Sequence, residues 1–386
     1  MPKPILRLGA PAEGALVLPQ AAPTASFLYA PRGVHLDADL CVVADTGNHR
    51  VLIWHGVPTD DGAKADVVLG QPDLESEGPN AGSGDTERGV HLPTGVDVMD
   101  GRLVVADAWN HRVLIWNRVP ERSFVPPDVI LGQPDAATVA PNHGADAPTA
   151  TSLYWPYGFG LVDGTFYVAD TGNRRVLGWD DGIPDPGEPP TILMGQDAST
   201  DRLENRGTGV GPDTFRWPHA IAGDARHLLV ADAGNHRVLM WAPPMDNDRP
   251  ADGLLGQKTF DTAREWPYDA QGPRALRFPY ALDTDGHRLV VADTANNRVL
   301  IWNHFAPTDR FSAADAVLGQ NDFDANGENR WDAVADDTLC WPYGLCLHRD
   351  RLAIADSGNN RVIVWSLADL SAPATAPDTA AASSAL

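Results

Sequence analysis

Six positions that directly follow a proline carry side chains able to bind a ligand or take part in chemistry. A guanidinium, an imidazole, an aliphatic hydroxyl and three phenols, gathered in one pocket, can bind an anion or hydrogen-bond a polar molecule. Glycine or alanine follows each position, which is consistent with close approach of neighbouring backbone. The six residues are Arg32, Thr94, Tyr157, His219, Tyr280 and Tyr343.

One unit recurs six times along the chain and contains these positions. Its clearest phrase is ADTGNHRVLIW, which begins at Ala44. A phrase such as VVLGQPD follows five of the copies, and a P-x-[GA] phrase precedes all six. The period is 61 to 63 residues, and repetition at a fixed period predicts a repeat architecture. The aspartates of the six copies are Asp45, Asp107, Asp170, Asp232, Asp293 and Asp356.

Each unit is predicted to form four short strands, A to D. In the first copy they span about 33–37, 40–44, 50–54 and 66–70. Strand C, with the sequence RVLIW, is apolar on both faces and therefore has to be covered on both. Sheets packed face to face in a ring supply that cover, so the sequence predicts an all-β, six-bladed β-propeller of four-stranded blades.

The two ends of the repeat region predict how the ring closes. The sixth copy ends after Trp365 without a Leu-Gly-Gln strand, whereas ILRLG at 5–9 lies one period before the first such strand. We therefore expect the N-terminal strand, residues 4–9, to complete the last blade and remove an open sheet edge. Residues 1–370 are predicted to form a single propeller, and the low-complexity tail 371–386 is predicted to be disordered.

The D-x-x-N-[HRN]-R-V pattern with P-x-[GA] upstream resembles the NHL repeat over roughly residues 4–366. The resemblance implies a six-bladed NHL β-propeller. The unit is longer than is usual in that family, and the excess lies between strand D of one blade and strand A of the next.

The flanking residues of the B-to-C turn are predicted to be structural. Each Asp faces an Arg five residues later across the hairpin, which suits a bidentate ion pair, and the turn Asn tolerates left-handed geometry. The strand-C tryptophans, from Trp54 to Trp365, are expected between blades. Three turns carry a histidine, for which a structural role is favoured over a metal site; these are His49, His111 and His236.

In an up-and-down blade the D-to-A connections and the B-to-C turns emerge on the same face. The long D-to-A loops and the six residues after the prolines should therefore share one rim, at the mouth of the central channel. The leading prediction is a binding protein that takes a small polar or anionic molecule, or a partner protein segment, at this mouth. A channel mouth plugged by its own hydrogen bonds, without a ligand, is the structural alternative.

An enzyme is the alternative from a different class, a metal-assisted lyase or hydrolase with its active site at the channel mouth. Peptidyl-hydroxyglycine amidating lyases are similar enzymes on this fold, in which histidines after the proline in three blades bind a catalytic zinc. The resemblance implies His219 as the matching metal ligand, and His35 and His91 near the same rim are further candidates. A zinc site with a bound water needs three protein ligands.

Calcium is the second metal that the sequence leaves open. The segment DFDANGE (322–328) begins like a calcium loop, but Ala333 stands where the last carboxylate ligand should be. A solvated turn is the competing interpretation.

Composition excludes several classes of partner. The chain of 386 residues has 29 Lys and Arg against 52 Asp and Glu, a net charge of −23. Such a balance disfavours nucleic acid and anionic membranes. Three cysteines do not form a disulfide framework, and neither a signal peptide nor a membrane span is visible. We expect a soluble, cytoplasmic, acidic protein.

Overall fold

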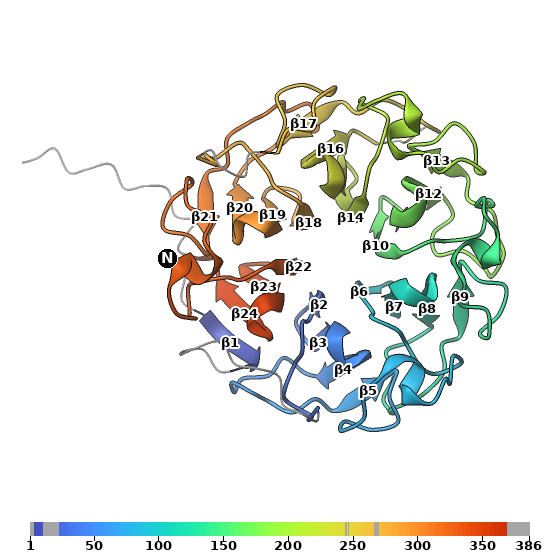
Figure 1. Ribbon diagram of the computed structural model, residues 1–386. Helices are drawn as coiled ribbons and strands as arrows, with labels where there is room; N and C mark the ends of the chain where they lie inside the picture. The colour runs from blue at the N-terminus through green and yellow to red at the C-terminus, as the bar shows by residue number, and fades with distance from the viewer. Residues whose placement is uncertain (1–3, 11–22, 244, 246, 266–269, 369–386) are drawn as a thin grey trace, which may run out of the picture.

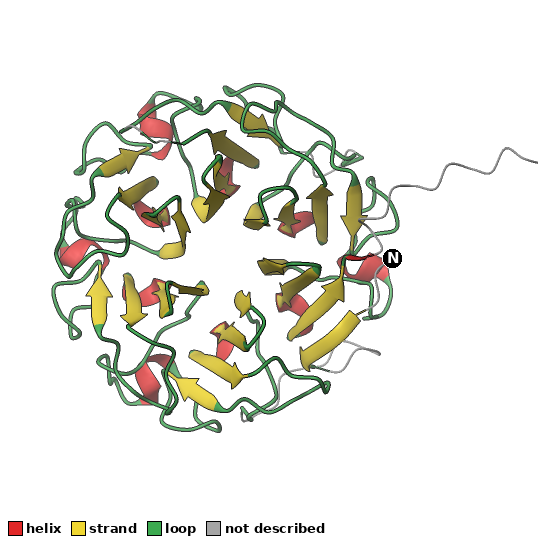
Figure 2. Ribbon diagram, turned by 180° about the vertical axis from the view of Figure 1, so that it is seen from behind, coloured by secondary structure: helices red, strands yellow, loops and turns green. Residues whose placement is uncertain are grey.

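The computed structural model describes residues 4–10, 23–243, 245, 247–265 and 270–368, so the predicted disordered tail 371–386 lies outside the described residues. Six four-stranded antiparallel sheets stand as blades around a central axis (Figure 1). The view from behind shows the same blades in a closed ring (Figure 2). The predicted all-β, six-bladed β-propeller is confirmed.

In five blades the four strands follow the chain from the axis outward, and in the sixth the outer strand is the N-terminal one. The innermost strands are β2 (Gly33–Leu36), β6 (Val96–Met99), β10 (Pro156–Val162), β14 (Pro218–Asp224), β18 (Pro279–Thr284) and β22 (Pro342–His348). The second strands are β3 (Leu40–Asp45), β7 (Arg102–Asp107), β11 (Thr165–Asp170), β15 (His227–Asp232), β19 (Leu289–Asp293) and β23 (Arg351–Asp356). The third strands are β4 (Arg50–His55), β8 (Arg112–Trp116), β12 (Arg175–Trp179), β16 (Arg237–Trp241), β20 (Arg298–Trp302) and β24 (Arg361–Ser366). The outer strands are β5 (Val67–Leu69), β9 (Val129–Leu131), β13 (Ile192–Met194), β17 (Gly253–Leu255), β21 (Ala316–Leu318) and β1 (Pro4–Gly9).

Strand β1 closes the ring, as predicted. It pairs antiparallel with β24, with Leu6 opposite Val364 and Leu8 opposite Val362, so the last blade has the order β1-β24-β23-β22. Leu6 and Leu8 are 2% and 1% exposed. The first and last strands of the ring therefore belong to one sheet.

The hydrophobic core lies between the blades. Val51 and Ile53 of β4 pack toward the second blade, whereas Leu52 and Trp54 pack toward the sixth. The strand-C tryptophans are all buried, and the indole of Trp54 also donates to the carbonyl of Ala63 at 3.2 Å. Their predicted place in the inter-blade core is confirmed.

The Asp–Arg pairs hold the B-to-C turns, but their geometry differs from the prediction. Arg50 donates through Nε alone to Asp45 Oδ2 at 2.7 Å, and its terminal nitrogens donate to backbone carbonyls, including that of Leu74. Asp45 Oδ1 accepts the amide of Tyr29 in the incoming loop. The predicted bidentate pair is wrong because the loop backbone uses the remaining donors and acceptor. All six pairs are fully buried, so these arginines form no surface for nucleic acid.

The turn itself is a short 3-10 segment, and its asparagine is not the left-handed residue. Asn48 lies inside the segment η1 (Thr46–Asn48) and donates to Asp45 Oδ2 at 2.8 Å. The following residue, His49, takes the left-handed conformation with φ of 53°. The equivalent turn segments are η3 (Ala108–Asn110), η5 (Thr171–Asn173), η7 (Ala233–Asn235), η8 (Thr294–Asn296) and η10 (Ser357–Asn359).

The long D-to-A loops lie on the same face as these turns, as predicted. The amide of Gly47 in the first turn donates to the carbonyl of Tyr29 in the loop at 2.8 Å. Four of the loops contain a 3-10 segment of their own, and its asparagine side chain forms a hydrogen bond with the turn asparagine of the next blade. For example, Asn110 Nδ2 donates to Asn80 Oδ1 at 2.8 Å. The loops are therefore tied to the neighbouring blade. These segments are η2 (Pro79–Gly82), η4 (Pro141–Gly144), η6 (Glu204–Gly207) and η9 (Glu328–Trp331).

Candidate functional site

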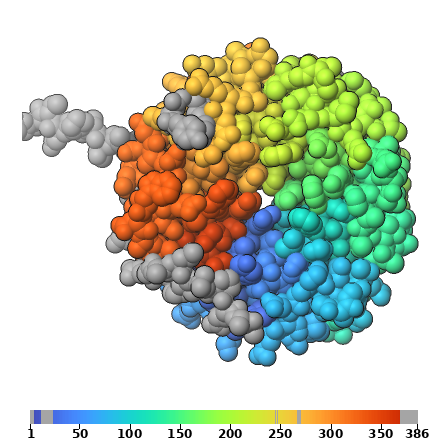
Figure 3. Space-filling model, in the orientation of Figure 1, coloured from blue at the N-terminus to red at the C-terminus, as the bar shows by residue number. Residues whose placement is uncertain are grey.

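The six residues after the prolines are brought together at the axis. They line one cavity of about 390 Å³, at the point where Figure 3 shows the molecule hollowed at its centre. We call them the mouth ring: Arg32, Thr94, Tyr157, His219, Tyr280 and Tyr343.

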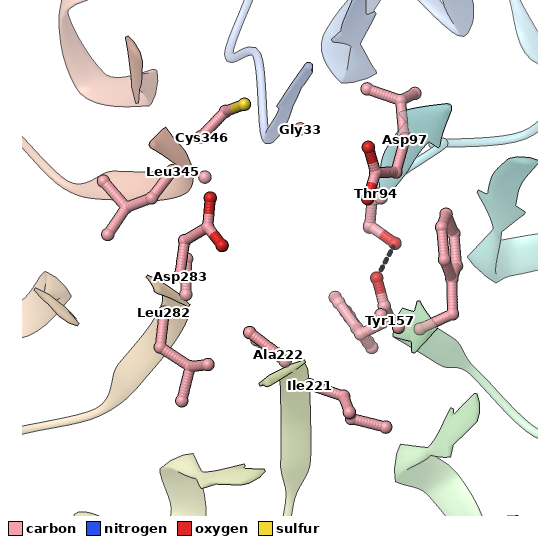
Figure 4. A pocket seen from close by; sticks show the side chains of 18 of the residues that line it. Gly33, Thr94, Asp97, Tyr157, Ile221, Ala222, Leu282, Asp283, Leu345 and Cys346 are labelled. Carbon is pink, nitrogen blue, oxygen red and sulfur yellow. Dashed lines mark hydrogen bonds between the residues drawn. The ribbon is translucent and has the colours of Figure 1, made fainter. Parts of the chain in front are cut away.

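Five side chains of the mouth ring form one continuous stack. The Arg32 guanidinium lies 4.6 Å above the Tyr343 ring, and the Tyr343 and Tyr280 rings stack at 4.8 Å. His219 lies between Tyr280 and Tyr157, with ring centroids 4.2 Å apart on each side. Thr94 completes the ring by donating its hydroxyl to the carbonyl of Tyr157 at 2.9 Å (Figure 4). The stack fixes the orientation of the rings.

Backbone geometry before each proline positions the mouth ring. In five blades the residue before the proline is left-handed, with φ between 47° and 52°, a conformation that costs a non-glycine residue about 1–2 kcal/mol. Its amide donates to a side chain of the preceding blade's turn. In two blades that acceptor is an asparagine, and in three it is the Nδ1 of a turn histidine, as in Trp155 N to His111 Nδ1 at 3.2 Å.

The turn histidines are thus inter-blade acceptors, in line with the structural role expected for them. Burial lowers the pKa of His49 and His111 to about 4, with the nearby imidazole of His91 acting in the same direction. A neutral ring is required for Nδ1 to accept a hydrogen bond. The exception is the third blade, where Arg174 occupies this place; the amide of Trp217 bonds Asp232 Oδ1 instead, and Trp217 is not left-handed.

Small residues after the mouth ring allow the innermost strands to approach each other. A Cβ on Gly344 would lie 2.3 Å from the carbonyl oxygen of Arg32, and one on Gly158 would lie 2.4 Å from that of His219. The close approach predicted for these positions is confirmed. This close approach of the strands places the side chain of each mouth-ring residue against the next one around the axis.

The electrostatics of the mouth ring centre on Arg32. Burial and the Arg32 charge together lower the pKa of His219 to about 3, so its imidazole is neutral. Burial raises the pKa of Tyr343 and Tyr280, which keeps both phenols protonated. Arg32 forms no ion pair with any described carboxylate, and its buried Nε has no hydrogen-bond partner in the described part of the chain. The mouth therefore holds one positive charge surrounded by neutral donors.

A second ring of residues lies three positions further along the innermost strands, and the sequence analysis missed it. Five residue types occur at the six positions, so the repeat pattern does not mark them, although counting from the prolines would have found them. Five of the six line the same cavity. We call this the inner ring: His35, Asp97, Gly160, Ala222, Asp283 and Cys346.

The inner ring carries the acidic groups of the cavity. Asp97 and Asp283 lie on opposite sides of the pocket (Figure 4). Asp97 Oδ1 contacts His35 Nδ1 at 2.6 Å, and although burial opposes it, this carboxylate together with Asp37 raises the pKa of His35. Burial raises the pKa of Asp283 to about 7, and raises that of the Cys346 thiol.

The described residues do not assemble a metal site around His219. Its neighbours are the rings of Tyr157 and Tyr280, and no group of three or more His, Cys, Asp or Glu able to hold a metal ion occurs in the described ranges. His35 instead bonds Asp97 in the inner ring, and His91 lies 5.1 Å from the His49 ring on the rim. The side chains present therefore do not fit the zinc centre that the lyase resemblance implies.

Backbone amides bond the carboxylates of the candidate calcium loop. Asp322 Oδ1 accepts the amides of Asp324 and Ala325, and Asp324 Oδ1 accepts that of Gly272. Asp322 is thus a turn acceptor, whereas Asp324 ties the loop to the preceding D-to-A loop.

Over the described ranges, no helix has the length and apolar character needed to cross a membrane.

Comparison with known proteins supports the fold. Residues 91–116, which span the proline phrase and strands A to C of the second blade, match the NHL repeat model. No curated protein matches the chain. A solved structure of a protein of unknown function from Bacteroides thetaiotaomicron is 12% identical, with 94% of this chain and 74% of that chain covered and a TM-score of 0.50.

Two further solved structures are less similar in shape. Virginiamycin B lyase from Staphylococcus aureus is 11% identical, covering 88% of this chain and 95% of that chain with a TM-score of 0.44. The nidogen/laminin complex is 14% identical, covering 79% and 83% with a TM-score of 0.41. The second unit thus matches the NHL repeat model, and the other five units repeat its motif in a closed six-bladed β-propeller.

Proposed function

We propose that the protein binds a small anionic molecule, of the carboxylate type, in the axial cavity, with Arg32 as its principal contact. The observation that carries the proposal is the unpaired Arg32 guanidinium. It shares the cavity with Asp283 and Asp97 but forms no ion pair with either carboxylate. Burying a charge is costly unless it is paired. A planar guanidinium is well suited to a carboxylate, which it can bind through two parallel hydrogen bonds.

The phenols of the mouth ring support the same function. The hydroxyls of Tyr157, Tyr280 and Tyr343 make no hydrogen bond to another described residue, so they are available to a ligand. Protonated phenols donate to an anion and do not repel it. The ring stack holds them in place, which lowers the entropy lost on binding.

The neutral protonation state of His219 favours binding over acid–base catalysis. A group with a pKa of about 3 is a weak base, and the neutral imidazole that remains near neutral pH is too weak an acid to serve as a proton donor. The lyase or hydrolase alternative would need another group in that role.

Isothermal titration with hexanoate tests the proposal. We expect Arg32→Leu to weaken binding by about 1.5–3 kcal/mol, the range for a hydrogen bond to a charged group. Arg32→Lys should give a smaller loss, because it keeps the charge but not the planar fork. Arg118→Leu, which removes an exposed arginine outside the cavity, is the matched control and should leave binding unchanged. Equal hexanoate affinity in Arg32→Leu and the native protein would contradict the proposal, as would the absence of binding to the native protein.

A further inference from the structure

Asp283 is a second uncompensated charge in the cavity. Its oxygens accept the amides of Leu347 and Thr284 at 2.6 and 2.7 Å, and it forms no ion pair with any described residue. Burial is the main cause of its raised pKa, and the charges that act on it, those of Asp97 and Asp285, are both negative. A cation beside Asp283 would therefore relieve the repulsion that its ionised form meets.

Asp97 faces Asp283 across the cavity and can act on the same cation. Its Oδ1 is used by His35 and by the amide of Val98, but its Oδ2 makes no hydrogen bond to another described residue. Its side chain is 43% exposed. Asp97 therefore adds negative potential to the inner ring and leaves one oxygen available.

The two unpaired charges lie at different depths of one cavity. Arg32 belongs to the mouth ring and Asp283 to the inner ring, three residues further along its strand. At about 3.3 Å per residue this places the two levels roughly 10 Å apart. Among the described residues, Arg32 and Asp283 form no ion pair with each other, so neither group neutralises the other.

We infer that the ligand of this cavity is a small zwitterion, whose carboxylate is bound by Arg32 and whose ammonium or guanidinium group is bound by Asp283 with Asp97 opposite. The inference rests on the proposed function and adds the second charge of the ligand. One molecule with both charges neutralises both groups, whereas a simple anion leaves Asp283 unpaired and a simple amine leaves Arg32 unpaired.

The shape of the inner ring leaves room for such a molecule. Gly160 and Ala222, which occupy the inner-ring positions of the third and fourth blades, have the smallest side chains of the ring. The cavity of about 390 Å³ is within the range of small-molecule sites.

Three matched probes test the inference by isothermal titration of the full chain. They are ε-aminohexanoate, hexanoate, which lacks the cation, and hexylamine, which lacks the anion. We expect the native protein to bind ε-aminohexanoate about tenfold or more tighter than either analogue, as for one added charged hydrogen bond. In Asp283→Asn this preference over hexanoate should disappear while hexanoate still binds. Asp60→Asn, at an exposed site away from the cavity, should keep the preference.

The outcomes separate this inference from the function on which it rests. If hexanoate binds through Arg32 and ε-aminohexanoate binds no tighter, the zwitterion is excluded and the anion site stands. If none of the three probes binds the native protein, both ideas fail. Because the three probes are compared first on the native protein, the inference is decided even if Asp283→Asn does not fold.

Discussion

In five blades, the side chain that follows the B-to-C turn helps to position the mouth ring without touching it. His49, His111 and His236 accept the amide that precedes the next blade's proline, and Asn297 and Asn360 do the same through Oδ1. The bond supports a left-handed residue two positions before a mouth-ring residue. The axial cavity therefore depends on a contact between blades at its rim.

We expect His111→Asn to retain stability at neutral pH, because asparagine is the acceptor in two other blades. His111→Ala should lose about 1–3 kcal/mol, because the buried amide of Trp155 is left without a partner. The two variants are compared by urea denaturation at pH 7. Equal stability of His111→Ala and the native protein would show that the bond to Trp155 contributes nothing.

The lowered pKa values of the turn histidines also predict how the stability of the protein depends on pH. The pKa of His49 and His111 is about 4 in the folded protein, against an ordinary value of 6.5, so the unfolded chain binds more protons between these values. The stability present above pH 6.5 is therefore lost as the pH falls toward 4. The double variant His49→Asn, His111→Asn should show a shallower loss over this range in denaturation curves measured from pH 7 to pH 4. An identical acid dependence in the two proteins would mean that other groups govern it.

At the scale of the element, some positions of the innermost strands could be predicted from the sequence and others could not. The first-blade strands were predicted at 33–37, 40–44, 50–54 and 66–70 and are observed within a few residues, because their apolar pattern recurs in every copy. The mouth ring could be located because each member follows a recurring proline. Asp97 and Asp283 could not, since no residue type recurs at their position in all copies. The raised pKa of Asp283 depends on burial within the ring, which no single strand encodes.

We predict that Gly344→Ala destabilises the protein by about 1–3 kcal/mol, the usual cost of forcing extra atoms into a packed region. The added Cβ would press on the backbone carbonyl of Arg32, so hexanoate binding should weaken as well. Ala281→Gly is the control at the equivalent position of the fifth blade, where a Cβ is already accommodated. It should lose only about 0.5–1 kcal/mol of stability. A Gly344→Ala protein as stable as the control would contradict the close approach of β22 and β2.

At the scale of the whole molecule, ring closure is concentrated in one short strand. Deleting residues 1–10 removes β1, with the buried Leu6 and Leu8, and uncovers the edge of β24. Burial of two leucines contributes about 3–6 kcal/mol, and an uncovered edge favours association between chains. We expect a lower thermal midpoint and larger species in size-exclusion chromatography. Ile5→Ala, at a residue 48% exposed in the same strand, should change neither. A deletion variant that melts and elutes like the full chain would show that β1 is dispensable.

The pairing of β1 with β24 also orders events during synthesis. The ribosome makes the first of these strands about 350 residues before the second, so β1 stays unpaired until β24 has been synthesised. The five intervening sheets can form one after another in the meantime. The axial cavity is lined by the innermost strands of all six sheets, so it is complete only once the sixth sheet lies beside the first.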